Sequence, residues 1–136
     1  MNSRFHYAFK VKDIVGTIHF YHHILDCKLG RQTEHWVDFD FFGHQLSAHV
    51  SEDIPDLDYC GHVDDLKVPI PHFGCIITEK EFDDLKQRLL SNQIEFIVKP
   101  QTRYKGKKGE QQTMFILDFS RNPLEFKSFK KEDEIF

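Results

Sequence analysis

The sequence has no long apolar run and no basic stripe, and each absence excludes a class of protein. No segment of about 20 apolar residues, the length that spans a bilayer, occurs in the 136 residues, and no signal peptide is recognised. Lys and Arg number 18 against 22 Asp and Glu, a net charge of −4, so the clustered cations that neutralise phosphates are missing. We therefore expect neither a membrane nor a nucleic acid as a partner.

Cysteine is scarce, and the three residues Cys27, Cys60 and Cys75 form no CxxC pair. An odd number of such cysteines is typical of a reducing compartment rather than of a secreted disulfide framework. A chain of this length buries roughly two thirds of its unfolded surface and needs no disulfide bonds to be stable. We therefore expect a cytoplasmic protein with an aromatic core, to which its 14 phenylalanines contribute.

The first half of the chain predicts a strand, a helix and three more strands. Residues 4–11 alternate between apolar and polar side chains, with His6 on the polar face. Asp13 is a good N-cap for an amphipathic helix that ends near Leu25. The three strands that follow are predicted at residues 28–33, 35–41 and 45–50, the last two joined by a tight turn at Gly43.

The second half repeats this order after residues 51–69, whose prolines, glycine and aspartates are typical of a connector rather than of packed structure. Residues 70–77 predict a strand, and Thr78 with Glu81 predicts a capping box at the start of a second helix. The buried stripe of this helix is predicted to consist of Phe82, Leu85 and Leu89. The remaining strands are predicted at residues 95–98, 112–117 and 124–129.

The two halves can be aligned with each other. His6 of the first copy matches His72 of the second, and an acidic residue follows seven positions later at the start of each helix. Two positions after each histidine stands a small residue, Ala8 or Gly74, which leaves room beside the imidazole. Matched histidines in two copies favour a shared chemical role over two unrelated core residues.

Glu125 lies between Leu124 and Phe126 in the last predicted strand, so its burial needs compensation, which a metal ion commonly provides. In the first copy, Ser47 or His49 takes the matching place, because a strand register that slips by two residues keeps the same face. We favour His49, because an imidazole can bind a metal.

This repeat resembles the vicinal oxygen chelate superfamily, which includes glyoxalase I, extradiol ring-cleaving dioxygenases, fosfomycin-resistance enzymes and bleomycin-binding proteins. The similarity covers nearly the whole chain and is specific in FHYAFKVKD, FYHHILDCKLG and LDFSRNPLEFKSF. The last of these is similar to the superfamily's closing D-P-x-G-x-x-x-E segment, with Phe119 in place of its proline and Asn122 in place of its glycine.

The resemblance implies one domain of α+β class, in which two tandem βαβββ units form a curved, incompletely closed eight-stranded barrel around a divalent metal. The units correspond to residues 4–50 and 70–130. The ligands that it implies are His6, His72 and Glu125, with His49 as the candidate for a fourth. It also implies a homodimer, because many members of the superfamily pair.

Two imidazoles and one carboxylate form the facial arrangement that suits Fe(II) and dioxygen, whereas Mn, Ni or Zn fits as well if His49 also binds. We therefore favour an extradiol-type ring-cleaving dioxygenase, with His49 or His44 as the acid–base residue. The expected substrate is a small aromatic molecule. Candidates to line its pocket are Trp36, Phe42 and Phe115.

Two other functions fit the same sequence. A lyase or isomerase of the glyoxalase kind needs a strong base beside the metal, and the absence of a glutamate from the fourth strand weakens that hypothesis. A metal-free drug-binding protein of the bleomycin-resistance kind is the third hypothesis, but such proteins typically lack the metal residues. For a single histidine the ordinary alternative is a core imidazole bonded to the backbone, and the match of His6, His72 and Glu125 argues against it.

Overall fold

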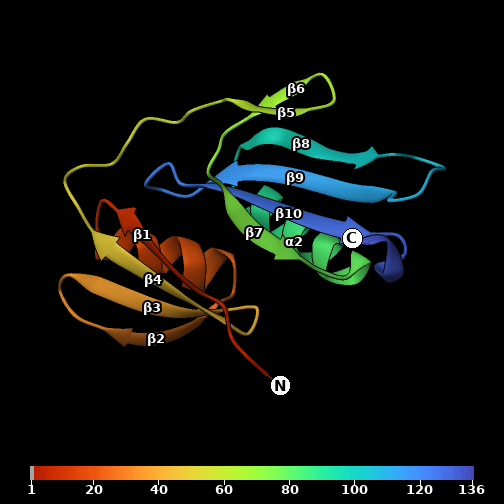
Figure 1. Cartoon of the computed structure of the whole chain (residues 1–136). Helices are drawn as coiled ribbons and strands as arrows, with labels where there is room; N and C mark the ends of the chain where they lie inside the picture. The colour runs from red at the N-terminus through yellow and green to blue at the C-terminus, as the bar shows by residue number, and fades with distance from the viewer. Residues whose placement is uncertain (1) are drawn as a thin grey trace. The chain divides into compact units, whose positions relative to one another are not determined.

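The computed structural model of this chain describes residues 2–136 and divides into two compact units (Figure 1). Unit 1 runs to Asp56 and includes the distant segment Asp118–Asn122. Unit 2 comprises Leu57–Leu117 and Pro123–Phe136. No helix among residues 2–136 is both long enough and apolar enough to span a bilayer.

Unit 1 contains a four-stranded sheet and one helical segment (Figure 1). Its strands lie in the order β1-β4-β3-β2, with β1 parallel to β4 and the other pairs antiparallel. In chain order its elements are β1 (His6–Val11), α1 (Ile14–Ile18), a π-helix (His19–Ile24), β2 (Lys28–Gln32), β3 (Trp36–Phe41) and β4 (His44–Val50). The predicted order of one strand, one helix and three strands is confirmed.

The helical segment begins where the sequence predicts but changes its form half-way. Asp13 caps it, because the Oδ1 atom of Asp13 accepts a hydrogen bond of 2.6 Å from the amide of Gly16. Further along, the amide of Leu25 donates to the carbonyl of Phe20, five residues back, as in a π-helix. Tyr21 is fully buried in this segment, and its ring lies 5.3 Å from that of Phe39 in β3.

The hairpin between β3 and β4 turns at Phe42 and Gly43, with φ angles of 51° and 88°. Two successive residues with positive φ are typical of a type I′ turn, whose twist matches that of the strands. The carboxylate of Asp40 accepts a hydrogen bond of 2.7 Å from the amide of Gly43 and supports the turn. The predicted turn is therefore confirmed.

Unit 2 repeats the same order. Its main sheet has the strand order β7-β10-β9-β8, with β7 parallel to β10. In chain order the elements are β7 (Phe73–Ile76), α2 (Glu79–Ser91), β8 (Phe96–Arg103), β9 (Gln111–Leu117), β10 (Pro123–Phe129) and one turn of 3₁₀-helix (Glu132–Glu134). The predicted capping box is present, because Thr78 and Glu81 each accept a hydrogen bond from the backbone amide of the other. The predicted stripe of Phe82, Leu85 and Leu89 is buried.

The expectation of an unpacked connector is wrong for part of residues 51–69. Strands β5 (Gly61–Val63) and β6 (Leu66–Val68) form a hairpin. Val68 is buried in a cluster with Val98 and Phe115, so the hairpin packs on the main sheet of unit 2. Strands of three residues are too short to show a hydrophobic period, which is why the sequence pattern missed them.

The segment Asp118–Asn122 is tied to the helical segment of unit 1 by the buried carboxylate of Asp118. This carboxylate accepts hydrogen bonds from the Tyr21 hydroxyl at 2.7 Å and from the amides of Ser120 and Asn122, each at 2.8 Å. Burial raises the pKa of Asp118, although these hydrogen bonds oppose the shift. Burial, together with the Asp118 charge, raises the pKa of Tyr21 well above its ordinary value, so the hydroxyl remains a donor.

Substitution Tyr21→Phe should destabilise the protein by about 2 kcal/mol, because it removes the hydroxyl donor from the buried carboxyl group of Asp118. Urea unfolding followed by circular dichroism measures this loss. Tyr59→Phe is the matched control, since Tyr59 is 44% exposed. Equal free energies of unfolding for the two variants would show that the Tyr21–Asp118 hydrogen bond contributes nothing net.

Candidate metal centre

His72 and Glu125 lie together in unit 2. Glu125 is in β10, where Leu124 and Phe126 point to the opposite face of the sheet, and it is only 7% exposed. The Nε2 atom of His72, just before β7, lies 3.2 Å from Oε1 of Glu125. The parallel pairing of β7 with β10 brings the imidazole to the carboxylate.

The backbone orients the His72 ring. Its Nδ1 atom lies 2.7 Å from the carbonyl oxygen of Pro69, so Nδ1–H donates there and Nε2 is turned to Glu125. The Phe115 ring packs edge-on against the imidazole, with ring centroids 4.9 Å apart. Histidines that bind metals in proteins commonly have this second hydrogen bond, because it fixes the tautomer.

Glu125 has partners for both of its oxygens. Thr113 in β9 donates a hydrogen bond of 2.5 Å to Oε2, and the ammonium of Lys127 lies 3.8 Å from Oε1. Burial alone would raise the pKa of Glu125, but the hydrogen bonds from His72 and Thr113 outweigh it and hold the pKa below its ordinary value. The carboxylate is therefore ionised at neutral pH and available as a ligand.

Gly74 makes this close pairing possible. It stands opposite Glu125 in the ladder, and a Cβ atom at this position would collide with the backbone carbonyl of Glu125. A cavity of about 220 Å³ lies beside the pair. Its lining residues are His72, Phe73, Gly74, Cys75, Ile76, Glu125 and Lys127.

The register of unit 1 assigns a different counterpart to Glu125 than the sequence favours. Ala8 stands opposite Ser47 in the pairing of β1 with β4, as Gly74 stands opposite Glu125 in unit 2. Ser47, and not His49, therefore takes the place of Glu125, and the preference for His49 at this position is wrong. The Ser47 hydroxyl is buried and donates a hydrogen bond of 2.7 Å to Asp38 in β3.

His6 repeats the arrangement of His72 within unit 1. Its Nδ1 atom lies 2.9 Å from the side-chain oxygen of Gln45, the residue opposite it in β4. With Nδ1–H donating to this oxygen, Nε2 keeps its lone pair on an exposed ring. His6 is thus prepared for a ligand in the same way as His72.

Of the two other histidines that the sequence singles out, His49 lies apart from His6. His49 stands opposite Lys10, four residues further along β1, which corresponds to about 13 Å along the strand. This spacing argues against His49 as a ligand of an ion that His6 holds. His44, at the start of β4, accepts a hydrogen bond of 2.9 Å at Nδ1 from the amide of Phe5.

Within residues 2–136, no group of three or more histidine, cysteine, aspartate or glutamate side chains is arranged to hold a metal ion. The structure brings together His72 and Glu125, whereas His6 belongs to unit 1. The pair fits a divalent ion in its chemistry, with one imidazole nitrogen, one carboxylate oxygen and a further hydrogen bond on each. A third ligand has to come from outside this pair.

The comparison with known proteins identifies the family. No protein-family model matches the chain. A solved structure of a glyoxalase/bleomycin resistance protein/dioxygenase from Alicyclobacillus acidocaldarius is 31% identical, over 99% of this chain and 97% of that chain, with a TM-score of 0.82. The chain belongs to this family. The resemblance to the vicinal oxygen chelate superfamily and the predicted fold class are thereby confirmed.

Structures of the fosfomycin resistance protein FosX from Listeria monocytogenes have the same fold as this family member. One is 17% identical, over 100% of this chain and 99% of that chain, with a TM-score of 0.75. A glutamate-to-glutamine variant, 16% identical over 99% of this chain and 98% of that chain, with a TM-score of 0.73, is complexed with Mn(II) and 1S,2S-dihydroxypropylphosphonic acid. Proteins of this fold thus include one that binds a divalent metal ion and a small molecule.

Sequence reasoning missed Thr113 and Pro69, which support the two candidate ligands of this family member. Thr113 could have been found from the sequence, because it is a polar residue next to the apolar run Met114–Leu117, much as Glu125 is a polar residue within an apolar strand. Pro69 could not have been found in this way. It acts through its backbone carbonyl, and the backbone carbonyl of any residue can accept a hydrogen bond.

In the metal-free protein, His72 should titrate above the ordinary value of about 6.5, and Glu125→Gln should lower its pKa. The hydrogen bond to Glu125 raises the pKa of His72 against the opposing effect of burial. The stability that this proton confers is present below the unfolded pKa and is lost as the pH rises through the raised one. NMR titration of the imidazole measures both values.

Glu95→Gln is the control for this titration, because it removes an exposed carboxylate from a loop and should leave His72 unchanged. A His72 pKa that is the same in Glu125→Gln and in Glu95→Gln would contradict the pairing.

Proposed function

We propose that this chain is a divalent-metal-dependent enzyme that acts on a small molecule, with His72, Glu125 and His6 as ligands of the ion. The observation that supports this most directly is the His72–Glu125 contact of 3.2 Å, in which each group already has a further partner. His6, like His72, has a hydrogen-bond partner at Nδ1, the side-chain oxygen of Gln45. Two imidazoles and one carboxylate leave open positions on the ion for a substrate.

Within this proposal we favour ring cleavage of the extradiol type. The ion, preferably Fe(II), would supply coordination of two neighbouring substrate oxygens and of dioxygen. The residues of the chain would orient the ligands and exchange a proton with the substrate. Pro69 fixes the ring of His72, Thr113 holds Glu125, and His44 has its Nδ1 occupied by the amide of Phe5, which leaves Nε2–H to exchange a proton with substrate.

Isomerisation of the glyoxalase kind has less support, because Ser47 stands where a second carboxylate would have to stand. A hydroxyl that donates to Asp38 is too weak a base to take a proton from carbon. Asp38 itself lies on β3, two strand spacings or about 10 Å from β1. It is therefore distant from the histidine with which such a base would have to act.

Protein purified without chelator should contain close to one divalent ion per chain, and His72→Ala and Glu125→Gln should each lose most of it. Each substitution removes a ligand from a site that has few. Mass spectrometry of the metals, at matched protein concentration, measures the content and identifies the ion. His35→Ala is the control, because His35 is exposed and its contact with Glu34 is a surface pair. Equal metal content in all four proteins would overturn the proposal.

Oxygen uptake with a panel of catechols should be detectable in the wild-type protein and should fall at least about 100-fold in Glu125→Gln, since loss of a metal ligand removes the reacting centre. A hemithioacetal assay on the same samples tests the isomerase reaction. Turnover of the hemithioacetal with no oxygen uptake would overturn the dioxygenase assignment and leave the metal site intact.

A homodimer is part of the same proposal and also rests on the family. Light scattering coupled to size exclusion measures it: a single species of twice the 16.2 kDa chain mass is expected. A monomer at all concentrations would contradict the dimer and would leave the ligand assignment unaffected.

A further inference from the structure

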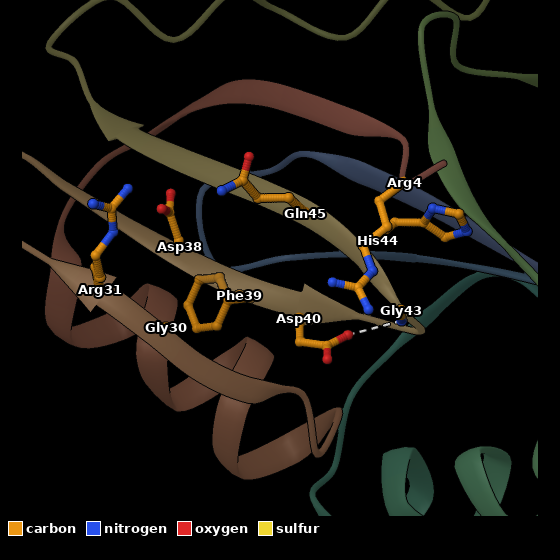
Figure 2. Close-up of a pocket in the computed structure, with 9 residues that line it drawn as sticks. All are labelled: Arg4, Gly30, Arg31, Asp38, Phe39, Asp40, Gly43, His44 and Gln45. Atoms are coloured by element: carbon orange, nitrogen blue, oxygen red, sulfur yellow. Dashed lines mark hydrogen bonds between the residues drawn. The ribbon is translucent and has the colours of Figure 1, made fainter. Parts of the chain in front are cut away.

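Two cavities lined by charged side chains differ in how their charges are arranged. In unit 1, a cavity of about 300 Å³ has an arginine at each end and two aspartates between them, as Figure 2 shows for Arg4, Arg31, Asp38 and Asp40. Charges of both signs therefore alternate along it. In unit 2, a cavity of about 350 Å³, here called the lysine cavity, has four lysines and two glutamates in its lining, a net charge of +2. These residues are Lys107, Lys108, Lys130, Lys131, Glu110 and Glu134.

The fold gathers these lysines from two segments that are distant in the sequence. Lys107 and Lys108 lie in the loop from β8 to β9, whereas Lys130 and Lys131 follow β10. Because the start of β9 pairs with the end of β10, the loop and the segment after β10 meet at one end of the sheet (Figure 1). The cluster depends on this pairing, and the sequence alone shows only two short basic segments.

The two glutamates of the lysine cavity hold the loop in place. Oε1 of Glu110 accepts a hydrogen bond of 2.8 Å from the amide of Gly106, and Oε2 of the same carboxylate lies 3.8 Å from the ammonium of Lys130. Oε1 of Glu134 accepts a hydrogen bond of 2.8 Å from the amide of Gly109. The loop is thus fixed against the segment after β10, and the carboxylates are directed to the loop backbone and to one lysine.

The other three ammonium groups have no anionic partner in the part of the chain that the structure describes. Within residues 2–136, no ion pair or side-chain hydrogen bond involves Lys107, Lys108 or Lys131. All three side chains are exposed. Like charges that line one cavity repel one another, and a bound anion removes this repulsion. The lysine cavity is therefore an anion-binding arrangement.

An oligophosphate fits this arrangement better than a single carboxylate or a nucleic-acid strand. A triphosphate carries about four negative charges on a short chain, so it can contact several ammonium groups at once. Its size, about a dozen heavy atoms, suits a cavity of about 350 Å³. A long nucleic acid would also meet Glu132 and Asp133, which are exposed directly after Lys131, on a chain whose net charge is −4.

We propose that the lysine cavity binds the phosphate chain of a small oligophosphate, either inorganic triphosphate or the triphosphate of a nucleotide. The ammonium groups of Lys107, Lys108 and Lys131 contact the phosphate oxygens. The site is separate from the candidate metal centre, because Glu125 lies four residues, or about 13 Å, before the end of β10. The inference does not depend on the proposed function.

Calorimetric titration of the whole chain with triphosphate, inorganic phosphate and ATP tests this binding. A salt concentration of about 0.15 M screens exposed charges that are more than about 8 Å apart. Triphosphate should bind at least about 10-fold more tightly than phosphate, because it contacts more ammonium groups. ATP distinguishes the two sources of the phosphate chain, since a nucleotide site binds it more tightly than triphosphate and an inorganic site does not.

A double variant, Lys107→Gln with Lys131→Gln, removes one ammonium group from each segment and should weaken triphosphate binding about 10-fold. The matched control is Lys80→Gln with Lys86→Gln, which changes the net charge equally. Both control lysines lie on α2, where their ion-pair partners are aspartates of the same helix. This control should bind triphosphate like the wild-type protein. Circular dichroism and melting temperature report whether both variants fold.

Glu125→Gln shows which site binds the phosphate. This variant should bind triphosphate like the wild-type protein, whereas loss of binding would assign the phosphate to the metal centre and overturn the inference. No measurable binding, equal losses in the two double variants, or tighter binding of decathymidylate than of triphosphate would also overturn it. A purified protein without metal would refute the proposed function and leave this site unaffected.

Discussion

The burial of Glu125 is the constraint on which unit 2 depends. A carboxylate at 7% exposure in an apolar strand is tolerated only when partners reach it, and here they come from β7 and β9, the strands on either side of β10. Thr113 approaches from β9, His72 from the start of β7, and Gly74 lets the backbone of β7 close on β10. Thr113 and His72 therefore have two effects. They stabilise the buried charge of Glu125, and they fix the orientation of this candidate ligand.

Unit 1 buries a carboxylate on the corresponding face but leaves it less satisfied. Asp38 has the Ser47 hydroxyl where Glu125 has His72 and Thr113. Where unit 2 has the carboxylate of Glu125, the matching register position of unit 1 has the hydroxyl of Ser47. In our proposal the unit with the paired carboxylate supplies two ligands of the ion, His72 and Glu125.

Much of the fold could be predicted, because its signals are local. The alternation in β1 and the capping box of Thr78 each follow from a few adjacent residues. The residue of unit 1 that matches Glu125 could not be predicted. Ser47 and His49 lie on the same face of their strand, and only the register of β4 against β1 distinguishes them. The hairpin at residues 61–68 was missed for another reason: its burial depends on Val98 and Phe115, distant in the chain.

The charge of the proposed ligand set bears on the reaction. One carboxylate and two neutral imidazoles would leave a divalent ion with a net charge of about +1, whereas a second glutamate at Ser47 would bring it to about zero. An ion with residual positive charge favours anionic oxygen ligands, and a deprotonated catechol supplies them. In the proposed site, the absence of the second carboxylate would thus both remove a base and favour anionic oxygen ligands on the ion.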